Sequence, residues 1–208
     1  MLQLLGRPNS INVRKVLWLC DELALHYTHE PQWGTPEQPL RTPEFLALNP
    51  NALVPVIRDG ALVLWESNTI CRYLASREGR TDLLPAEAAA RAKVERWMDW
   101  QLGDLNNAWR YAFMALVRKG ADYTDTQAID ASVASWNRHM TLLDEQLQRT
   151  ALYAAGATFT LADIVLGLAT HRWFSTPMQR PALAAVQAYY DRLSERPAFL
   201  KHGRNGIP

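Results

Sequence analysis

The sequence of 208 residues has few of the residues that build disulfide, thiol-exchange or metal sites. Its 2 cysteines, Cys20 and Cys71, stand alone in apolar stretches, and no CxxC pair for thiol exchange occurs. Its 5 histidines do not combine with cysteine or carboxylate at metal-ligand spacing. We therefore expect no metal, and two buried free thiols in a reducing compartment.

Charge of one sign and long apolar runs are also missing. The formal net charge is +1, so we expect neither nucleic acid nor an acidic membrane surface as the main partner. No apolar run approaches the roughly 20 residues that cross a membrane. The start, MLQLLGRPNS, lacks the basic and then apolar pattern of a signal peptide. These absences predict a soluble, cytoplasmic protein.

What the chain does contain falls into two parts of different pattern. The first part alternates strand and helix periodicities, and Asp59-Gly60 between two β-rich runs is a strong hairpin signal. The expected order is β-α-β-α-β-β-α. The elements are a strand at 3–5, a helix with apolar positions from Val13 to Ala24, a strand at 26–30, a helix at 43–48, the hairpin, and a helix at 67–77.

From Ala86 onward the periodicity is almost only helical. One long apolar stripe runs to Leu116, and Gly103 inside it marks either a bend or a tolerated glycine. Further helices are expected at 126–149, from TFTLADIVLGL onward, and at 181–195. The break at 79–85 predicts a boundary between a mixed part, residues 1–80, and an all-helical part, residues 86–208.

The helix that begins in TFTLADIVLGL has a clear start signal. Thr160 and Asp163 have the spacing of a capping box, and Phe159 can pack on Ile164 as a hydrophobic staple. We interpret this pair as structural, because capping groups stabilise the helix and take no part in chemistry.

Four stretches carry a resemblance that spans the whole chain: SINVRKVLWLCDEL, PEFLALNPNALVPVI, LWESNTICRYL and FTLADI. With the order of elements, they resemble the cytosolic glutathione S-transferases, most of all the bacterial B-type (GstB-like) branch. The resemblance implies an α+β fold: a thioredoxin-like domain over 1–80 that binds glutathione, followed by an all-α domain over 86–208 that carries the electrophile site.

Glu66 and Ser67 lie where a strand passes into a helix. Ser67 is a natural N-cap, and first-turn amides at a helix N-terminus suit a carboxylate. The resemblance implies that this turn receives the α-carboxylate of the γ-glutamyl group and that Glu66 takes its amine. It also implies a cis bond between Val54 and Pro55. Together with Leu53, these residues would let the peptide pair with the backbone of Val54.

Two residues compete to hold the glutathione sulfur. In serine-type members of the family, the hydroxyl that serves the sulfur lies where Ser10 falls here, at the start of the first helix. Asn12 can donate an amide hydrogen to the same atom, and Arg14 or Arg7 can bias the local charge. Ser10 as a mere helix cap is the structural alternative.

The chain also departs from the serine-type pattern. Leu40 stands where a histidine is common, and Ala52 and Leu53 replace a basic or histidine residue before the proline. Both family positions help to hold the glycyl carboxylate, so glutathione either binds weakly or is held by substitutes. The available substitutes are Arg41, Gln38, Trp33 and Asn51.

The second substrate is expected against the long helix that follows Leu105. Aromatic walls and one cation occur together there, although aromatic residues at helical spacing are more often core. Arg110 facing the sulfur would favour small or anionic electrophiles such as halogenated acids. The residues assigned to this site are Trp109, Arg110, Tyr111 and Met114, with Phe113 beside them.

The interpretation is a homodimeric glutathione transferase for detoxification, with glutathione as co-substrate and a small electrophile as partner. Glutathione-dependent peroxide or disulfide reduction is a second enzymatic alternative. A non-catalytic module that binds proteins is the third, and the presence of Ser10 and the Glu66-Ser67 pair argues against it.

Overall fold

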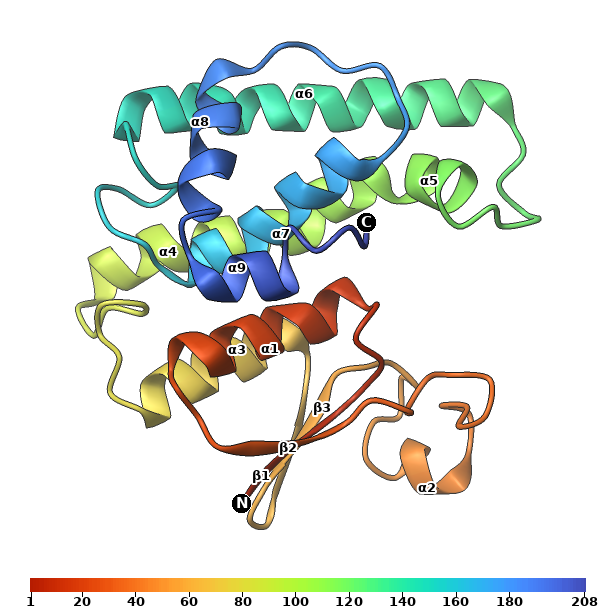
Figure 1. Ribbon diagram of the computed structural model, residues 1–208, viewed down its shortest axis with the longest axis vertical. Helices are drawn as coiled ribbons and strands as arrows, with labels where there is room; N and C mark the ends of the chain where they lie inside the picture. The colour runs from red at the N-terminus through yellow and green to blue at the C-terminus, as the bar shows by residue number, and fades with distance from the viewer.

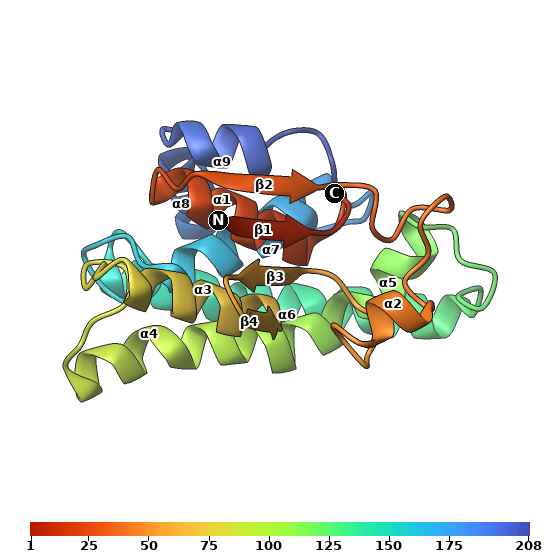
Figure 2. The ribbon, with the colours of Figure 1, turned by 90° about the horizontal axis from the view of Figure 1, so that it is seen from below.

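The computed structural model describes residues 1–208 and begins with a four-stranded mixed sheet. The strand order is β2-β1-β3-β4, with β1 parallel to β2 and the other two pairs antiparallel (Figure 2). Four-residue strands suffice because all three apolar side chains of β1, Leu2, Leu4 and Leu5, are buried. The strands are β1 Leu2–Leu5, β2 Tyr27–Glu30, β3 Val56–Asp59 and β4 Leu62–Trp65.

Three helices belong to this mixed part: α1 Ile11–Glu22, α2 Pro43–Leu46 and α3 Ser67–Arg77. Helices α1 and α3 cover one face of the sheet, and α2 lies away from them (Figure 1). Thr42 caps α2 by accepting a hydrogen bond from the Phe45 amide at 3.3 Å. The predicted order β-α-β-α-β-β-α and the thioredoxin-like α+β class are confirmed.

The rest of the chain is helical and lies on the far side of α1 and α3 from the sheet (Figure 1). Helix α4 continues through the π-helical turn η1 into α5, so the predicted stripe is one long rod with Gly103 in its irregular turn. The elements are α4 Ala88–Trp100, η1 Gln101–Leu105, α5 Asn106–Leu116, α6 Thr126–Thr150, α7 Leu161–Ser175, α8 Ala184–Leu193 and α9 Pro197–His202.

Three local predictions need correction. The hairpin turn is Gly60-Ala61, since Asp59 pairs with Leu62 inside the ladder. Helix α8 begins at Ala184, three residues later than expected, with extended Leu183 at its N-cap. Helix α9 was not predicted; Pro197 at its first position starts it, and a six-residue helix is too short to show a period.

One hydrophobic core joins the two parts. Trp18 of α1 is fully buried and packs on Phe159 and Phe199, which come from the segment before α7 and from α9. Helix α7 is buried from Leu161 to Trp173. A Cβ on Gly167 would lie 2.7 Å from Leu193 and 3.0 Å from Trp18, so this glycine permits the close packing.

The predicted capping box at the start of α7 is confirmed. The Asp163 carboxylate accepts hydrogen bonds from the Thr160 amide at 2.8 Å and the Thr160 hydroxyl at 3.1 Å. It also accepts from the Ala154 amide at 3.0 Å and the Tyr189 hydroxyl at 3.1 Å. Burial raises the pKa of Asp163 to about 6 in spite of these four donors.

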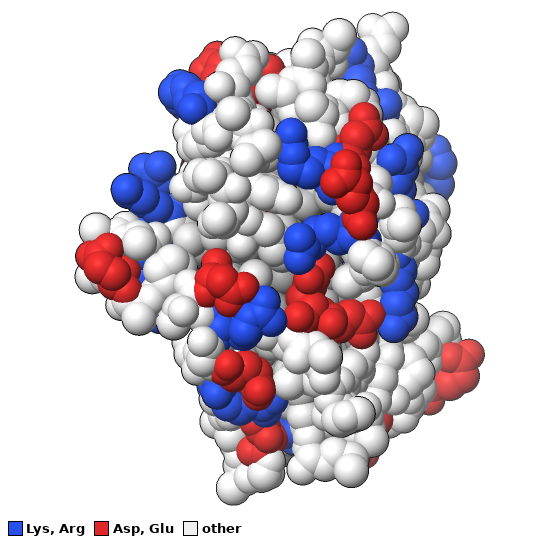
Figure 3. All heavy atoms as spheres, turned by 60° about the vertical axis from the view of Figure 1, so that its left-hand side comes forward, with Lys and Arg blue, Asp and Glu red and all other residues white.

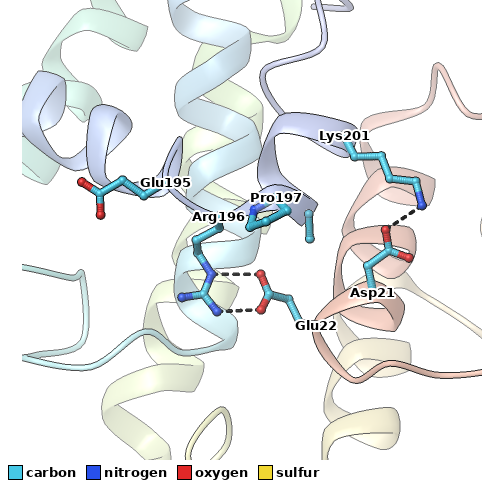
Figure 4. A pocket seen from close by; sticks show the side chains of 7 residues that line it. Asp21, Glu22, Glu195, Arg196, Pro197 and Lys201 are labelled. Atoms are coloured by element: carbon cyan, nitrogen blue, oxygen red, sulfur yellow. Dashed lines mark hydrogen bonds and ion pairs between the residues drawn. The ribbon is translucent and has the colours of Figure 1, made fainter.

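A hollow of about 510 Å³ between the end of α1 and α9 is a structural junction (Figure 4). Four of its five charged side chains are paired, Arg196 with Glu22 at 2.6 Å and Lys201 with Asp21 at 2.8 Å. Only one of its lining residues is hydrophobic. These ion pairs connect the end of α1 to the start and the last turn of α9, and they leave few free groups for a ligand.

The surface matches the small net charge. On the face in Figure 3, basic and acidic side chains lie interspersed, with uncharged surface between them. None of the helices has the length and apolar character needed to pass through a lipid bilayer. Cys20 and Cys71 are both free and buried, as predicted.

Candidate functional site

The start of α1 brings both predicted sulfur ligands to one end of a helix. Ser10 is the N-cap residue in extended conformation, and its hydroxyl makes no capping hydrogen bond. Asn12 stands in the first turn and lines a pocket with Glu66 and Ser67. Its Oδ1 atom is buried and has no hydrogen-bond partner. An unpartnered buried amide oxygen costs free energy, so this side chain is placed for something other than stability.

The start of α3 forms the opposite wall of the pocket. Glu66 occupies the N-cap position with φ 71° and ψ 108°, and Ser67 is the first helical residue. The predicted N-cap is therefore displaced by one residue. A positive φ at a non-glycine residue is strained, and such strain gathers at functional sites. The first-turn amides behind Glu66 point toward the pocket side of the helix and attract a carboxylate.

The loop before β3 closes the pocket with Leu53, Val54, Pro55 and Asn49. The Val54-Pro55 bond is cis, as the resemblance implied. Asn49 is buried and donates from Nδ2 to the Leu53 carbonyl at 2.8 Å, which holds the loop. Sequence reasoning did not assign Asn49, although its position between PEFLAL and LVPVI was the available signal.

Gly6 makes the approach of this loop to α1 possible. Its φ is +143°, and a Cβ there would lie 2.6 Å from Val13 and 2.9 Å from Val54. Any larger residue would push α1 and the loop apart. Gly6 therefore lets two of the three walls of the pocket, α1 and the loop before β3, come together.

The residues proposed for the glycyl carboxylate lie beyond this pocket. Arg41 is exposed and makes no ion pair, in the segment between β2 and α2. Gln38 donates nothing from its side chain, and its carbonyl accepts from the Gly34 amide at 2.9 Å. Trp33 is buried against Phe45 and donates to Glu30 at 2.9 Å, so its indole is already occupied.

Unpaired cations surround the start of α1. Arg118, at the end of α5, donates to the Asn9 carbonyl at 3.4 Å, which brings the helical part to the loop before Ser10. Arg7 donates to the Gly34 carbonyl at 2.8 Å. Arg14 is buried and donates to Ile207 and Pro208 carbonyls, and burial lowers its pKa to about 10. Arg7 and Arg118 form no ion pair with an acidic side chain, so this end of the molecule favours an anion.

The four residues assigned to the electrophile do not share one face of α5. Trp109 is 9% exposed, lies against Trp136 and the Arg172 guanidinium, and donates to Asn106 at 3.1 Å. Arg110 is exposed, and Met114 one turn later is half-buried. The Tyr111 hydroxyl accepts from the Asp125 amide at 3.3 Å on the side of α6. Of the assigned set, Arg110 and Met114 can act together.

Comparison with known proteins agrees with the fold. The family model for the N-terminal domain of glutathione S-transferase matches residues 9–77. Glutathione S-transferase GstB of Escherichia coli K12 is 39% identical over 203 residues, which are 97% of each chain. Glutathione S-transferase 3 of Zea mays is 36% identical over 96% of this chain and 92% of its own.

A solved structure has the same fold over the whole chain. The theta class glutathione S-transferase from Xanthomonas axonopodis pv. citri with glutathione bound has a TM-score of 0.91 at 38% identity, covering 100% of this chain and 99% of its own. The chain therefore belongs to the glutathione S-transferase family, and the predicted class of enzyme, a glutathione transferase, is confirmed at this level.

Proposed function

We propose that this enzyme binds glutathione in the pocket between α1, α3 and the loop before β3, and transfers it to a small electrophile. The observation that carries the proposal is that Asn12, whose amide oxygen has no partner within the protein, lines one pocket with Glu66 and Ser67. The start of α3 receives the γ-glutamyl carboxylate, Glu66 receives the amine, and the backbone of Val54 pairs with the cysteinyl residue of the peptide.

Catalysis consists of holding a thiolate and presenting it to the electrophile. A free thiol of pKa ~8.5 is only about 3% ionised at neutral pH, and lowering its pKa by about two units requires about 2.7 kcal/mol. One hydrogen bond to a charged group supplies roughly 1.5–3 kcal/mol and a helix N-terminus roughly 0.3–1. The two together suffice, so the protein needs no catalytic base.

We propose that Asn12 and Ser10 both act on the sulfur, with Asn12 the larger contributor. Asn12 lines the pocket, and no contact within the protein fixes its Oδ1 atom, so the side-chain amide can turn its Nδ2 donor toward the sulfur. Ser10 stands one residue outside the helix. Exclusive use of the Ser10 hydroxyl remains the alternative, and the experiment below separates the two.

We further propose that the electrophile is small and anionic, with halogenated acids as the test class. Support comes from the cations Arg7 and Arg118, which lie by the start of α1 without acidic partners. Arg110 and Met114 offer a cation and an apolar surface on the same side of α5. An anionic electrophile would reach the thiolate with its carboxylate on these guanidinium groups.

The proposal includes a homodimeric assembly and a location in the cytoplasm. A homodimer would cover exposed apolar side chains of the hairpin and of η1, since Leu62, Val63 and Leu102 are each about 40% exposed. The two unpaired buried thiols suit the reducing cytoplasm.

Peroxide or disulfide reduction is the second activity to test, because a glutathione thiolate can also attack oxygen or sulfur. Neither free cysteine of the protein lines the glutathione pocket, so such a reaction would rely on the thiol of glutathione alone. A non-catalytic binding module would have no use for the unpartnered Asn12 amide.

The test is a calorimetric titration with glutathione, with the bound thiolate followed by ultraviolet difference absorbance against pH. Wild type is expected to bind and to hold the thiol pKa below ~8.5. Asn12→Ala is expected to move that pKa most of the way back, and Ser10→Ala by less. Ser76→Ala, an exposed serine of α3, is the matched control. Absence of binding by wild type would overturn the proposal and favour the binding module.

A further inference from the structure

A lysine without an acidic partner is buried between the two parts of the chain. Lys15 of α1 has no solvent exposure. Its Nζ donates to Gln101 Oε1 at 2.7 Å and to Asn68 Oδ1 at 3.2 Å, and it forms no ion pair. Burial lowers the pKa of Lys15 to about 8, opposed by the nearby Cys71 and Glu66 groups.

Stability does not explain this residue. Burying an ammonium group is costly, and amide oxygens compensate it less than a carboxylate would. A leucine or methionine at this buried position of α1 would avoid that cost, since α1 already contributes Val16 and Leu19 to the hydrophobic core. The placement of a charge here therefore calls for a function.

Both hydrogen bonds of Lys15 lead to functional elements. Asn68 directly follows Ser67 in the first turn of α3, and its own Nδ2 donates to the Met98 carbonyl of α4 at 2.9 Å. Lys15 therefore holds the turn that faces the glutathione pocket. Asn12 lies one helical turn before Lys15 on the same side of α1.

The second bond leads toward α5. Gln101 begins the π-helical turn η1, and its Nε2 donates to Asn106 Oδ1 at 2.8 Å. The same Asn106 oxygen accepts from Trp109 Nε1 at 3.1 Å. π-Helical turns frequently occur at functional sites, and this one presents Gln101 to Lys15. A continuous buried chain thus runs from the start of α3 through Lys15 to α5.

We propose that Lys15 is a positioning residue that fixes the glutathione-binding turn of α3 to the electrophile helix α5, so that the two subsites are set in one geometry. This inference rests on the proposed function. Lys15 touches no substrate; it acts through Asn68 on one side and through Gln101 and Asn106 on the other. Loss of the link leaves each subsite present but misaligned with the other.

The test compares two ligands across a double-mutant cycle of Lys15→Met and Gln101→Leu. Calorimetry measures Kd for glutathione and for S-hexylglutathione, whose alkyl group extends from the sulfur toward the electrophile side. Each single variant is expected to weaken S-hexylglutathione binding by about tenfold and glutathione binding by less. The double variant is expected to be no weaker than the weaker single variant, because both break one chain of contacts.

The controls separate this role from a general loss of structure. Lys93→Met removes an exposed lysine of α4 and is expected to leave both Kd values unchanged. Far-ultraviolet circular dichroism and a thermal scan establish that each variant is folded, and if Lys15→Met does not fold, Gln101→Leu alone carries the test, because Lys15 keeps Asn68 as a partner there.

Three results would overturn the inference. They are unchanged S-hexylglutathione binding in a folded single variant, equal losses for both ligands, and additive losses in the double variant. If wild type itself does not bind glutathione, the proposed function fails and the inference fails with it. If wild type binds and the variants behave like it, only the role of Lys15 is rejected.

Discussion

Two buried polar groups, one in each part of the molecule, differ in how far their hydrogen bonds are satisfied. Asp163 in the helical part accepts from four donors, on Ala154, Thr160 and Tyr189. Asn12 in the sheet-containing part has a buried amide oxygen without any partner. Both sit in the first turn of a helix, and both would cost free energy if left alone.

The contrast separates structure from function. A polar group whose partners all come from the protein itself is accounted for by folding. A group that lines a pocket and lacks a partner within the protein has a place for a ligand atom. Lys15 and His171 are intermediate cases. Both are buried and hydrogen-bonded, but burial disfavours their charged forms and lowers the pKa of each. The comparison predicts graded effects on stability, which are largest for Asp163 and smallest for Asn12.

The largest effect is expected for Asp163→Ala. Although the Tyr189 hydroxyl keeps the backbone carbonyl of residue 163 at 3.4 Å, the change removes the acceptor of the Ala154 amide, the Thr160 amide and the Thr160 hydroxyl. At about 1–3 kcal/mol each, these groups would lower the free energy of unfolding by about 3 kcal/mol or more. Urea unfolding followed by circular dichroism measures the loss. Asp122→Ala, at an exposed position, is the matched control and is expected to change little.

The role of Asp163 would be wrong if the variant unfolded like wild type but had lost glutathione binding. Such a result would move Asp163 from the structural class to the functional one and would remove the basis of the comparison.

The capping box also shows which features the sequence could predict. Thr160 and Asp163 are three residues apart, Ser10 lies directly before a helix, and the hairpin turn depends on Gly60. Each feature is set by neighbours in the chain, so local spacing suffices to predict it. The resemblance added the cis bond before Pro55, which the dipeptide itself does not predict.

Features that depend on distant residues could not be predicted. The partner of Lys15 is 86 positions away in the sequence, and the Asn12 pocket becomes complete only when α3 and the loop before β3 meet α1. Trp109 looked like a wall of the electrophile site, yet it is 9% exposed because Arg172 and Trp136 pack on it. Helical periodicity gives the buried side of a helix without saying what it is buried against.

An intermediate effect is expected for His171 as the pH falls. The Ile207 carbonyl can only accept, so Nε2 of His171 donates to it at 3.0 Å. Nδ1 lies 2.8 Å from the Tyr190 hydroxyl, which can donate to the neutral ring. Burial, with the charge of Arg14 as the next cause, lowers the pKa of His171 from 6.5 to about 4.

The direction in which stability changes with pH depends on whether the folded or the unfolded chain binds the proton first. Between pH 6.5 and about 4 the unfolded chain binds a proton at His171 and the folded chain does not, so stability is lost as the pH falls through this range. Asp163 has the opposite effect, because its raised pKa lets the folded chain bind the proton first between about 6 and 3.8. A matched variant is needed to separate the two.

His171→Gln provides that variant. Urea titrations give the free energy of unfolding at about pH 7 and at about pH 4.5. This free energy is expected to fall between the two pH values by about 2 kcal/mol more in wild type than in His171→Gln. Equal falls in both proteins would mean that His171 is already protonated in the folded state, and would place it with the satisfied groups.

The smallest effect on stability is expected for Asn12→Ala in the absence of ligand. Removing a buried acceptor that has no partner relieves its desolvation cost, so the free energy of unfolding should stay within about 0.5 kcal/mol of wild type or rise slightly.

Glutathione is expected to separate Asn12→Ala from wild type, because a ligand that binds the folded state stabilises it by an amount that grows with affinity. Saturating glutathione is expected to raise the melting temperature of wild type clearly and that of Asn12→Ala much less, as measured by calorimetric scans. A variant that was destabilised without ligand and stabilised normally by glutathione would show that Asn12 is a structural residue like Asp163, and that its missing partner is not a ligand atom.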